Sequence, residues 1–149
     1  MIPPHRLPAR LSHSVAETEA IAGELAIQLS PGDCVALYGD LGAGKTQFVR
    51  GLVRALGGNP RAVSSPTYVL LNIYPTPKLA VYHLDAYRVH GSEDFDAIGF
   101  PELLEQGGLV VIEWPARVES LLPDSRVNVS LVSTSPRTRK ITITHIPPL

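Results

Sequence analysis

Residues 39–46 contain the residue types that a polyphosphate site needs. Their sequence, Gly39-Asp40-Leu41-Gly42-Ala43-Gly44-Lys45-Thr46, matches the pattern G-x-x-x-x-G-K-[ST] at every constrained position. Glycines remove the β-carbons that would keep backbone N–H groups away from phosphate oxygens. The lysine can reach the β- and γ-phosphates, and the threonine hydroxyl can bind Mg²⁺. The pattern therefore predicts that all eight residues line a nucleotide site.

The flanks of this loop have the patterns of the elements that must position it. An apolar run occupies 34–38, before the loop, and apolar residues at helical spacing occupy 47–56, after it. A strand leading in and a helix leading out distinguish a phosphate site from a chance match. The first N–H groups of such a helix point at the bound anion. Gly57 and Gly58 should end the helix in left-handed conformations.

Two acids follow apolar runs farther along the chain. Residues 69–74 and 79–84 predict an antiparallel pair of strands, and Asp85 comes directly after the second one. Residues 109–112 predict a strand buried on both faces, which ends at Glu113. Open α/β sheets bind ligands at the carboxyl ends of their strands. We therefore expect Asp85 to bind a metal ion and Glu113 to lie at the same site, although both could be solvated strand ends.

Other polar and aromatic residues have more than one interpretation. Thr67 lies within 63–68, which is either a connecting loop or a switch-like segment whose hydroxyl senses the γ-phosphate or its metal. Trp114 is either a core residue or a cover for the site. His83 and His90 are expected to be structural or solvated, because no metal-ligand spacing joins them.

The rest of the chain is expected to surround this loop in one domain. Residues 1–12 are predicted to be a loose tail, and residues 13–149 form the domain. A capping box predicts a helix at 15–29, two short helices are expected within 92–106, and 126–133 with 138–145 predict a hairpin. A small basic cluster on this hairpin is interpreted as a solubility feature of an edge strand or as an RNA contact; it consists of Arg137, Arg139 and Lys140.

The composition limits the class of protein. A chain of 149 residues with 44% hydrophobic residues, 18% charged residues and a net charge of −1 suits one globular domain. Its single cysteine, Cys34, excludes a disulfide framework and favours a buried thiol in a reducing compartment. No stretch has the pattern of a signal peptide or of a membrane span. We therefore expect a cytoplasmic protein without a membrane partner.

Four motifs and a terminal hairpin together resemble one known family. GDLGAGKT, SSPTY, HLDAYR and IEWP occur in this order across roughly residues 15–145, and this combination resembles the TsaE (YjeE) family of small bacterial ATPases. The resemblance implies an α/β fold with a single P-loop NTPase-like domain. Its sheet would be mixed and mostly parallel, flanked by helices, with antiparallel strands at the C-terminal end. The resemblance also implies ATP and Mg²⁺ as cofactors.

The same resemblance implies a role in making N6-threonylcarbamoyladenosine in tRNAs that read codons beginning with A. The implied partners are the TsaD and TsaB proteins of this pathway, and contact with tRNA would be indirect. The carbamoyl-transfer chemistry belongs to TsaD, so this chain would drive or reset the complex between cycles. We expect slow ATP hydrolysis by the chain alone and faster hydrolysis with these partners.

Residue roles carried over from the family motifs agree with those predicted from the residues. Lys45 would contact the phosphates, Thr46 and Asp85 would lie near Mg²⁺, Thr67 would lie in the switch-like segment, and Glu113 would lie beside the γ-phosphate. Lys45, Glu113 and Thr67 are thus the catalytic candidates, and Thr46, Asp85 and Glu113 are the candidates at the metal.

Two residues depart from the family motifs. Family loops usually continue GKTT where this chain has Gln47, and HLDAYR usually carries a larger apolar residue than Ala86. Neither position has a role named above, so we expect tuning of the site rather than its loss.

Two other classes of function remain open. A small-molecule kinase would share the loop and both acids, but it must also enclose an acceptor and exclude water. No insertion with hinge glycines and paired arginines is visible for that task. A regulatory nucleotide-binding module without catalysis is disfavoured by the complete set of candidate residues. No N-K-x-D motif supports GTP as the nucleotide.

Overall fold

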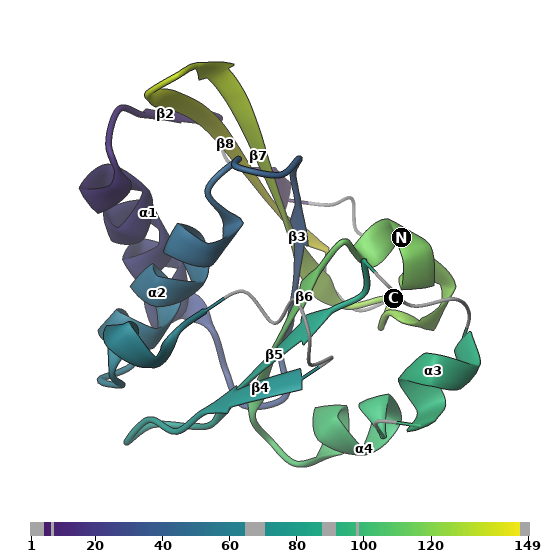
Figure 1. Ribbon diagram of the computed structural model, residues 1–149. Helices are drawn as coiled ribbons and strands as arrows, with labels where there is room; N and C mark the ends of the chain where they lie inside the picture. The colour runs from purple at the N-terminus through teal and green to yellow at the C-terminus, as the bar shows by residue number, and fades with distance from the viewer. Residues whose placement is uncertain (1–4, 7, 65–70, 88–91, 98, 147–149) are drawn as a thin grey trace.

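The computed structural model describes residues 5–6, 8–64, 71–87, 92–97 and 99–146 (Figure 1). Two earlier interpretations, those of Thr67 and His90, lie outside the described residues. Among the described helices, none is both long and apolar enough to cross a membrane.

Four parallel strands form the centre of the sheet. They are β3 (Cys34–Tyr38), β5 (Val81–Asp85), β6 (Leu109–Glu113) and β7 (Arg126–Ser135). β6 pairs with β3 and β5, and β3 also pairs with β7. Every residue of β5 and β6 is buried, as expected for strands that are covered on both faces. The predicted strands at 34–38 and 109–112 are confirmed.

Antiparallel strands extend the sheet at both edges. β4 (Leu71–Tyr74) pairs with β5, and β8 (Thr138–Ile146) pairs with β7. Two short strands, β1 (His5–Arg6) and β2 (Arg10–Ser12), pair with β8. The order among the described residues is β1-β8-β7-β3-β6-β5-β4, with β2 also on β8 (Figure 1). The mixed sheet and the predicted hairpin at 126–145 are confirmed, and the parallel part of the sheet is limited to the four central strands. The predicted pair of strands at 69–74 and 79–84 is confirmed for residues 71–74, whereas residues 69 and 70 lie outside the described part of the chain.

The prediction of a loose tail at residues 1–12 is wrong for the part that the structure describes. Arg10–Ser12 pair with β8, and Ser12 is fully buried. The Ser12 hydroxyl lies 2.7 Å from the Thr18 hydroxyl and donates to the Ser14 carbonyl oxygen at 2.9 Å. The pairing follows from the exposed edge of β8, whose unpaired backbone groups accept a further strand. Strands of two or three residues are too short to show a pattern in the sequence.

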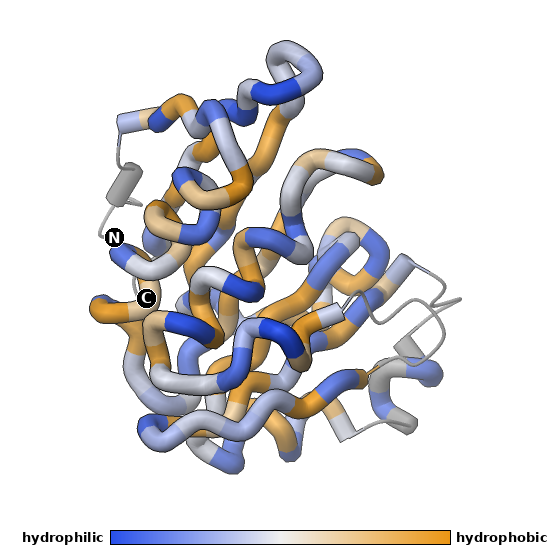
Figure 2. Tube along the Cα trace, turned by 60° about the vertical axis from the view of Figure 1, so that its left-hand side comes forward, coloured by the Kyte–Doolittle hydropathy of each residue, from blue (hydrophilic) through white to orange (hydrophobic). Residues whose placement is uncertain are grey.

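Helices cover both faces of the sheet. α1 (Val15–Gln28) and α2 (Lys45–Ala55) lie on one face, and α3 (Ser92–Ala97), α4 (Phe100–Glu105) and the 3₁₀ helix η2 (Pro115–Leu121) lie on the other (Figure 1). A short 3₁₀ helix, η1 (Pro60–Ala62), follows α2. Alternate residues of the central strands enter two separate cores, one beneath each helical layer. In Figure 2 hydrophobic residues are frequent on the inner segments of the molecule, and hydrophilic residues are frequent on its outer ones.

Local signals explain where the first two helices begin and end. The Ser14 hydroxyl accepts the Glu17 N–H at 3.1 Å, and the Glu17 carboxylate accepts the N–H of His13 at 2.7 Å. These bonds satisfy N–H groups at the start of α1. The bounds of α1 agree with the predicted helix at 15–29 to within one residue. α2 begins at Lys45, earlier than the predicted 47–56. Gly57, with φ +87°, follows its end, whereas Gly58 does not have positive φ.

Two glycines test how closely α1 and α2 approach each other. A β-carbon at Gly51 would lie 2.3 Å from the Glu19 carbonyl oxygen, whereas one at Gly23 would lie 3.5 Å from the Ala55 β-carbon. Gly51→Ala should therefore lower the free energy of unfolding by about 1–3 kcal/mol through overpacking. Gly23→Ala should raise it by about 0.5–1 kcal/mol, because alanine favours the helix. Urea unfolding measures both. Equal stabilisation by both substitutions would contradict this packing.

Candidate nucleotide-binding site

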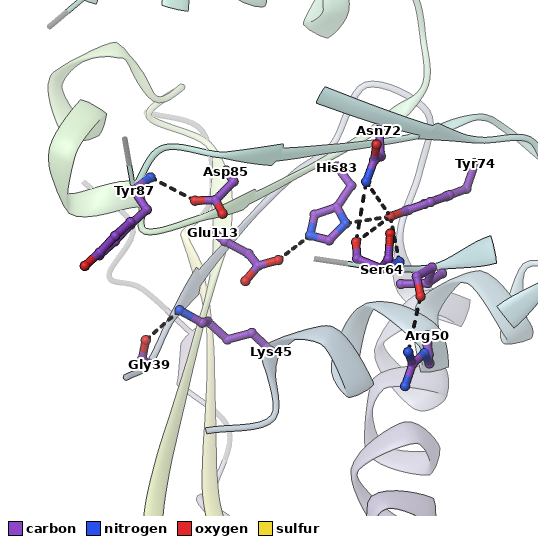
Figure 3. Close-up of polar contacts among 11 residues, drawn as sticks. Gly39, Lys45, Arg50, Ser64, Asn72, Tyr74, His83, Asp85, Tyr87 and Glu113 are labelled. Atoms are coloured by element: carbon purple, nitrogen blue, oxygen red, sulfur yellow. Dashed lines mark hydrogen bonds and ion pairs between the residues drawn. The ribbon is translucent and has the colours of Figure 1, made fainter. Parts of the chain in front are cut away.

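The candidate residues meet where three parallel strands end. β3 runs into the loop at 39–44, β5 ends at Asp85, and β6 ends at Glu113. In the register of the sheet Glu113 is opposite Leu37 on one side and Asp85 on the other. Side chains along a strand alternate between the two faces of the sheet. Val81 and Val111 belong to the core beneath α1 and α2, and each lies an even number of residues before an acid. Asp85 and Glu113 therefore lie on that same face. The acids and the start of α2 therefore approach one another (Figure 3).

The backbone of the loop favours glycine at all three of its glycine positions. Gly42 and Gly44 have φ of +79° and +103°, which side chains other than glycine rarely adopt. A β-carbon at Gly39 would lie 2.9 Å from the Leu131 carbonyl oxygen. Asp40 and Leu41 are exposed on the outer side of the loop. α2 begins directly after the loop, and its N-cap, Gly44, has no side chain to occupy the first N–H groups of the helix, as an anion site requires.

Lys45 is buried at the mouth of the loop. Its side chain is 5% exposed, and its Nζ donates to the Gly39 carbonyl oxygen at 2.8 Å. The same Nζ lies 3.5 Å from the centroid of the Trp114 ring, a cation–π contact. Burial lowers the pKa of Lys45, and the nearby carboxylates of Glu113, Asp85 and Asp40 oppose this shift. Its partners are thus a neutral carbonyl and a ring, which stabilise the ammonium group less than phosphate oxygens would.

The two acids are also buried, and each has a different partner. Asp85 is 8% exposed and accepts the N–H of Tyr87 at 2.8 Å. Burial raises the pKa of Asp85, the negative charge of Glu113 adds to this shift, and the Tyr87 N–H and Lys45 oppose it. Glu113 is 3% exposed, and its Oε2 lies 2.5 Å from Nε2 of His83 (Figure 3). Asp85 is therefore the less satisfied carboxylate.

The arrangement of the acids fits a metal that is shared with a ligand rather than held by protein alone. No group of three or more His, Cys, Asp or Glu side chains in the described ranges could hold a metal ion. Mg²⁺ in nucleotide sites usually takes one or two protein ligands and completes its shell with phosphate oxygens and water. Thr46, half-buried in the first turn of α2, and Asp85 match this requirement. A role of Glu113 as a direct ligand stays a prediction.

Trp114 combines its two interpretations, because it packs against one of the two cores and also covers Lys45 at the site. It has φ 56° and ψ 49°, and it is the one residue other than glycine with positive φ among those described. Its half-buried ring packs on Lys45 and lies with its centroid 4.9 Å from that of Tyr87. Unfavourable backbone conformations of this kind persist where surrounding contacts hold them, often at functional sites. The ring thus shields the Lys45 ammonium group from water.

Sequence reasoning missed three contacts of this region, although the structural interpretation of His83 is confirmed by its burial. His83, expected to be structural or solvated, is fully buried and contacts Glu113, and Tyr74 contacts His83 in turn. The spacing of His83 and Asp85, two residues apart on one strand, places both on the same face and could have indicated the contact. Arg139, part of the cluster interpreted as a solubility feature or as an RNA contact, donates to the Gly42 carbonyl oxygen at 3.1 Å. No local pattern could indicate that contact, because it joins segments 97 residues apart.

Two cavities border the loop. One, of about 410 Å³, is lined by Gly42, Gly44 and Gln47, the start of α1, and the tip of the β7–β8 hairpin with Arg137 and Arg139. The other, of about 340 Å³, lies between the first residues of the loop, Trp114 and residues 130–133 of β7. The first is bordered by the glycines with positive φ, so a ligand held by the loop can extend into it.

Comparisons with known proteins agree on one family. The model of the family described as "Threonylcarbamoyl adenosine biosynthesis protein TsaE" matches residues 12–141. The chain is 42% identical over 119 residues to the tRNA threonylcarbamoyladenosine biosynthesis protein TsaE of Rickettsia prowazekii, covering 80% of this chain and 82% of the relative. It is 40% identical over 138 residues to the TsaE protein of Treponema pallidum, covering 93% and 98%.

A solved structure agrees with the sequence comparisons. The crystal structure of YdiB from Bacillus subtilis matches with a TM-score of 0.78 at 29% identity, and the match covers 98% of this chain and 89% of YdiB. Likeness of this extent includes both helical layers and the sheet that carries the loop. The chain therefore belongs to the TsaE family of tRNA threonylcarbamoyladenosine biosynthesis proteins, and this membership implies a nucleotide-binding role.

Proposed function

We propose that this protein binds ATP with Mg²⁺ and hydrolyses it, and that this turnover supports N6-threonylcarbamoyladenosine modification of tRNA through the TsaD–TsaB complex. The observation that carries the proposal is the convergence of three buried charged groups, Lys45, Asp85 and Glu113, at the mouth of the glycine loop. Family membership favours this function over the small-molecule kinase that the loop alone would also allow.

The energetics of these groups support a polyanion and a cation as ligands. Removing a charge from water costs several kcal/mol unless partners compensate it. Lys45 contacts a carbonyl and an aromatic ring, and burial lowers its pKa. Burial also outweighs the partners of Asp85, because the pKa of this carboxyl is raised. A phosphate group beside Lys45 and a cation beside Asp85 would offset both costs. The site therefore suits a nucleotide with its Mg²⁺ better than it suits either alone.

Each residue has one task in this proposal. Lys45 and the loop N–H groups bind the phosphates, and the nucleoside extends into the cavity of about 410 Å³. Thr46 and Asp85 hold Mg²⁺. Bound ATP supplies the phosphoanhydride bond to be cleaved, and Mg²⁺ supplies positive charge for its phosphate oxygens. Glu113 orients the attacking water and can accept its proton. The role of Thr67 in sensing the γ-phosphate stays a prediction.

The partner proteins belong to the proposal because the site is open on one side. Asp40, Leu41 and Tyr87 are exposed around the buried charges, so the surface of another protein can reach the rim of the site. A partner that closes over a phosphate site can supply missing transition-state contacts, as arginine fingers do with accelerations of about 10³–10⁵. The TsaD–TsaB complex, implied by the family resemblance, is the proposed partner.

Lys45→Ala tests the phosphate contact. Losing charge-assisted hydrogen bonds of about 1.5–3 kcal/mol should weaken ATP binding by about 10- to 150-fold while the fold persists. Lys78→Ala, which removes an exposed lysine in the β4–β5 loop, is the matched control and should leave affinity unchanged. Calorimetric titration with ATP and Mg²⁺ measures both. Wild-type affinity in a folded Lys45→Ala protein would refute the site.

Asp85→Asn tests the metal role and its cost in stability. Because the folded-state pKa of Asp85 is raised, ionisation of this carboxyl destabilises the fold above its ordinary pKa of 3.8. At pH 7 the nucleotide-free variant should therefore melt at a higher temperature than wild type, by about 2–4 °C for each kcal/mol gained in the free energy of unfolding. This difference in melting temperature should shrink toward pH 4. The same variant should need more Mg²⁺ for ATP hydrolysis. Asp124→Asn is the exposed control, and matching Mg²⁺ titrations for wild type and Asp85→Asn would exclude the metal role.

Glu113→Gln tests the chemical step and the partner. Losing a group that accepts a proton costs about 10²–10⁴-fold in rate, so the variant should retain ATP binding and lose at least about 100-fold of the rate stimulated by TsaD–TsaB. Glu105→Gln, an exposed change on α4, should be stimulated like wild type. ATP turnover is measured for each protein with and without the complex. Full stimulation of Glu113→Gln, or a wild-type rate that the complex does not change, would contradict the proposal.

A further inference from the structure

A chain of buried hydrogen bonds leads away from Glu113. His83, which is fully buried, contacts Oε2 of Glu113 through Nε2 at 2.5 Å and the Tyr74 hydroxyl through Nδ1 at 3.0 Å. The Tyr74 hydroxyl lies 3.0 Å from the Ser64 carbonyl oxygen and accepts the Ser64 N–H at 3.3 Å. Asn72 also donates to the Tyr74 hydroxyl, at 3.4 Å. The chain thus joins β6, β5, β4 and the segment after η1 (Figure 3).

The positions of the hydrogens decide which group donates in each of these hydrogen bonds. Burial raises the pKa of Tyr74, so its hydroxyl keeps its one proton. That proton goes either to Nδ1 of His83 or to the Ser64 carbonyl oxygen. In the first case Nδ1 of His83 accepts the hydroxyl proton, and in the second Nδ1 donates to the hydroxyl oxygen. With Glu113 ionised, Nε2 of His83 therefore donates to the carboxylate in both arrangements.

The contact leaves one oxygen of Glu113 for chemistry. His83 occupies Oε2, while the other carboxylate oxygen points toward the side where Lys45 lies (Figure 3). A carboxylate held by one donor in a water-poor site has fewer orientations than one that is free to rotate. The ring that holds it cannot turn either, because Tyr74 holds its other nitrogen. This resembles the general arrangement in which a third group orients a base.

We propose that His83, oriented by Tyr74 and through it by the Ser64 backbone, is the positioning residue of Glu113. His83 contacts no phosphate, metal or water in this assignment and acts through the carboxylate alone. The consequence for ATP hydrolysis rests on the proposed function, whereas the hydrogen-bonded chain itself does not. The two parts therefore need separate measurements.

Two amide substitutions separate the two contacts of the ring. The amide nitrogen of Gln can take the place of Nε2, and that of Asn can take the place of Nδ1. His83→Asn should lower the stimulated kcat by about 10- to 100-fold and change KM for ATP by less than about 3-fold, because Lys45 and the loop are untouched. His83→Gln should recover most of this loss. Equal losses in both variants, or an effect on KM alone, would overturn the proposal.

Tyr74→Phe tests the second link against a matched control. Removing the hydroxyl frees one side of the His83 ring, so kcat should fall by about 3- to 10-fold with KM unchanged. Tyr82→Phe removes a hydroxyl that donates to Gln106 at 2.8 Å on the other face of the sheet, and it should leave kcat unchanged. Thermal melting checks that all variants are folded. A fall in kcat of the same size in both tyrosine variants would contradict the assignment.

Nuclear magnetic resonance of the ring tests the chain without any turnover. The Nε2–H signal of ¹⁵N-labelled His83, identified by its absence in His83→Gln, should move upfield in Glu113→Gln, and the Nδ1 signal should move in Tyr74→Phe. Ring signals that neither substitution changes would refute the chain. If these shifts occur while wild type hydrolyses no ATP with or without TsaD–TsaB, the proposed function fails and the hydrogen-bonded positioning of Glu113 stands.

Discussion

Three charged side chains removed from water at one edge of the sheet constrain the rest of the structure. Lys45, Asp85 and Glu113 are each less than a tenth exposed, and groups of this kind stay ionised only where partners or neighbours compensate them. Three adjacent parallel strands bring them together, because the carboxyl ends of such strands share an edge. The apolar cores beneath the two helical layers must offset the remaining cost of burial.

The surroundings compensate the three charges unequally. Glu113 has a strong partner in His83, which the sheet holds on the neighbouring strand. Asp85 has one backbone N–H, and Lys45 has a carbonyl and the face of Trp114. Buried ion pairs with full compensation are often kept for structure, whereas incompletely compensated groups are typical of sites that bind a charged ligand. Glu113, proposed for the chemical step, thus has the stronger partner, whereas Lys45, proposed for binding, has neutral partners that phosphate oxygens can replace.

Elements with strong local signals could be predicted from the sequence nearly to the residue. The apolar run before the loop defined β3, the Ser14 cap defined the start of α1, and the buried run at 109–112 defined β6. Short elements without periodicity could not be predicted, and the pairing of Arg10–Ser12 with β8 is the clearest case. The edge of β8 creates that pairing, and it exists only after the β7–β8 hairpin has formed.

The candidate site likewise has features that the sequence predicts and features that only the fold decides. The sequence by itself determined the phosphate loop, Lys45 with Thr46, and the two acids at strand ends, because a glycine pattern and apolar runs are local properties of the chain. Only the tertiary structure decided that Trp114 lies on Lys45, that Arg139 reaches the loop, and that His83 holds Glu113. All three contacts join residues 30 to 97 positions apart, and the way the strands and the β7–β8 hairpin pack sets their distances. No local pattern specifies this packing, since it depends on how the whole chain folds.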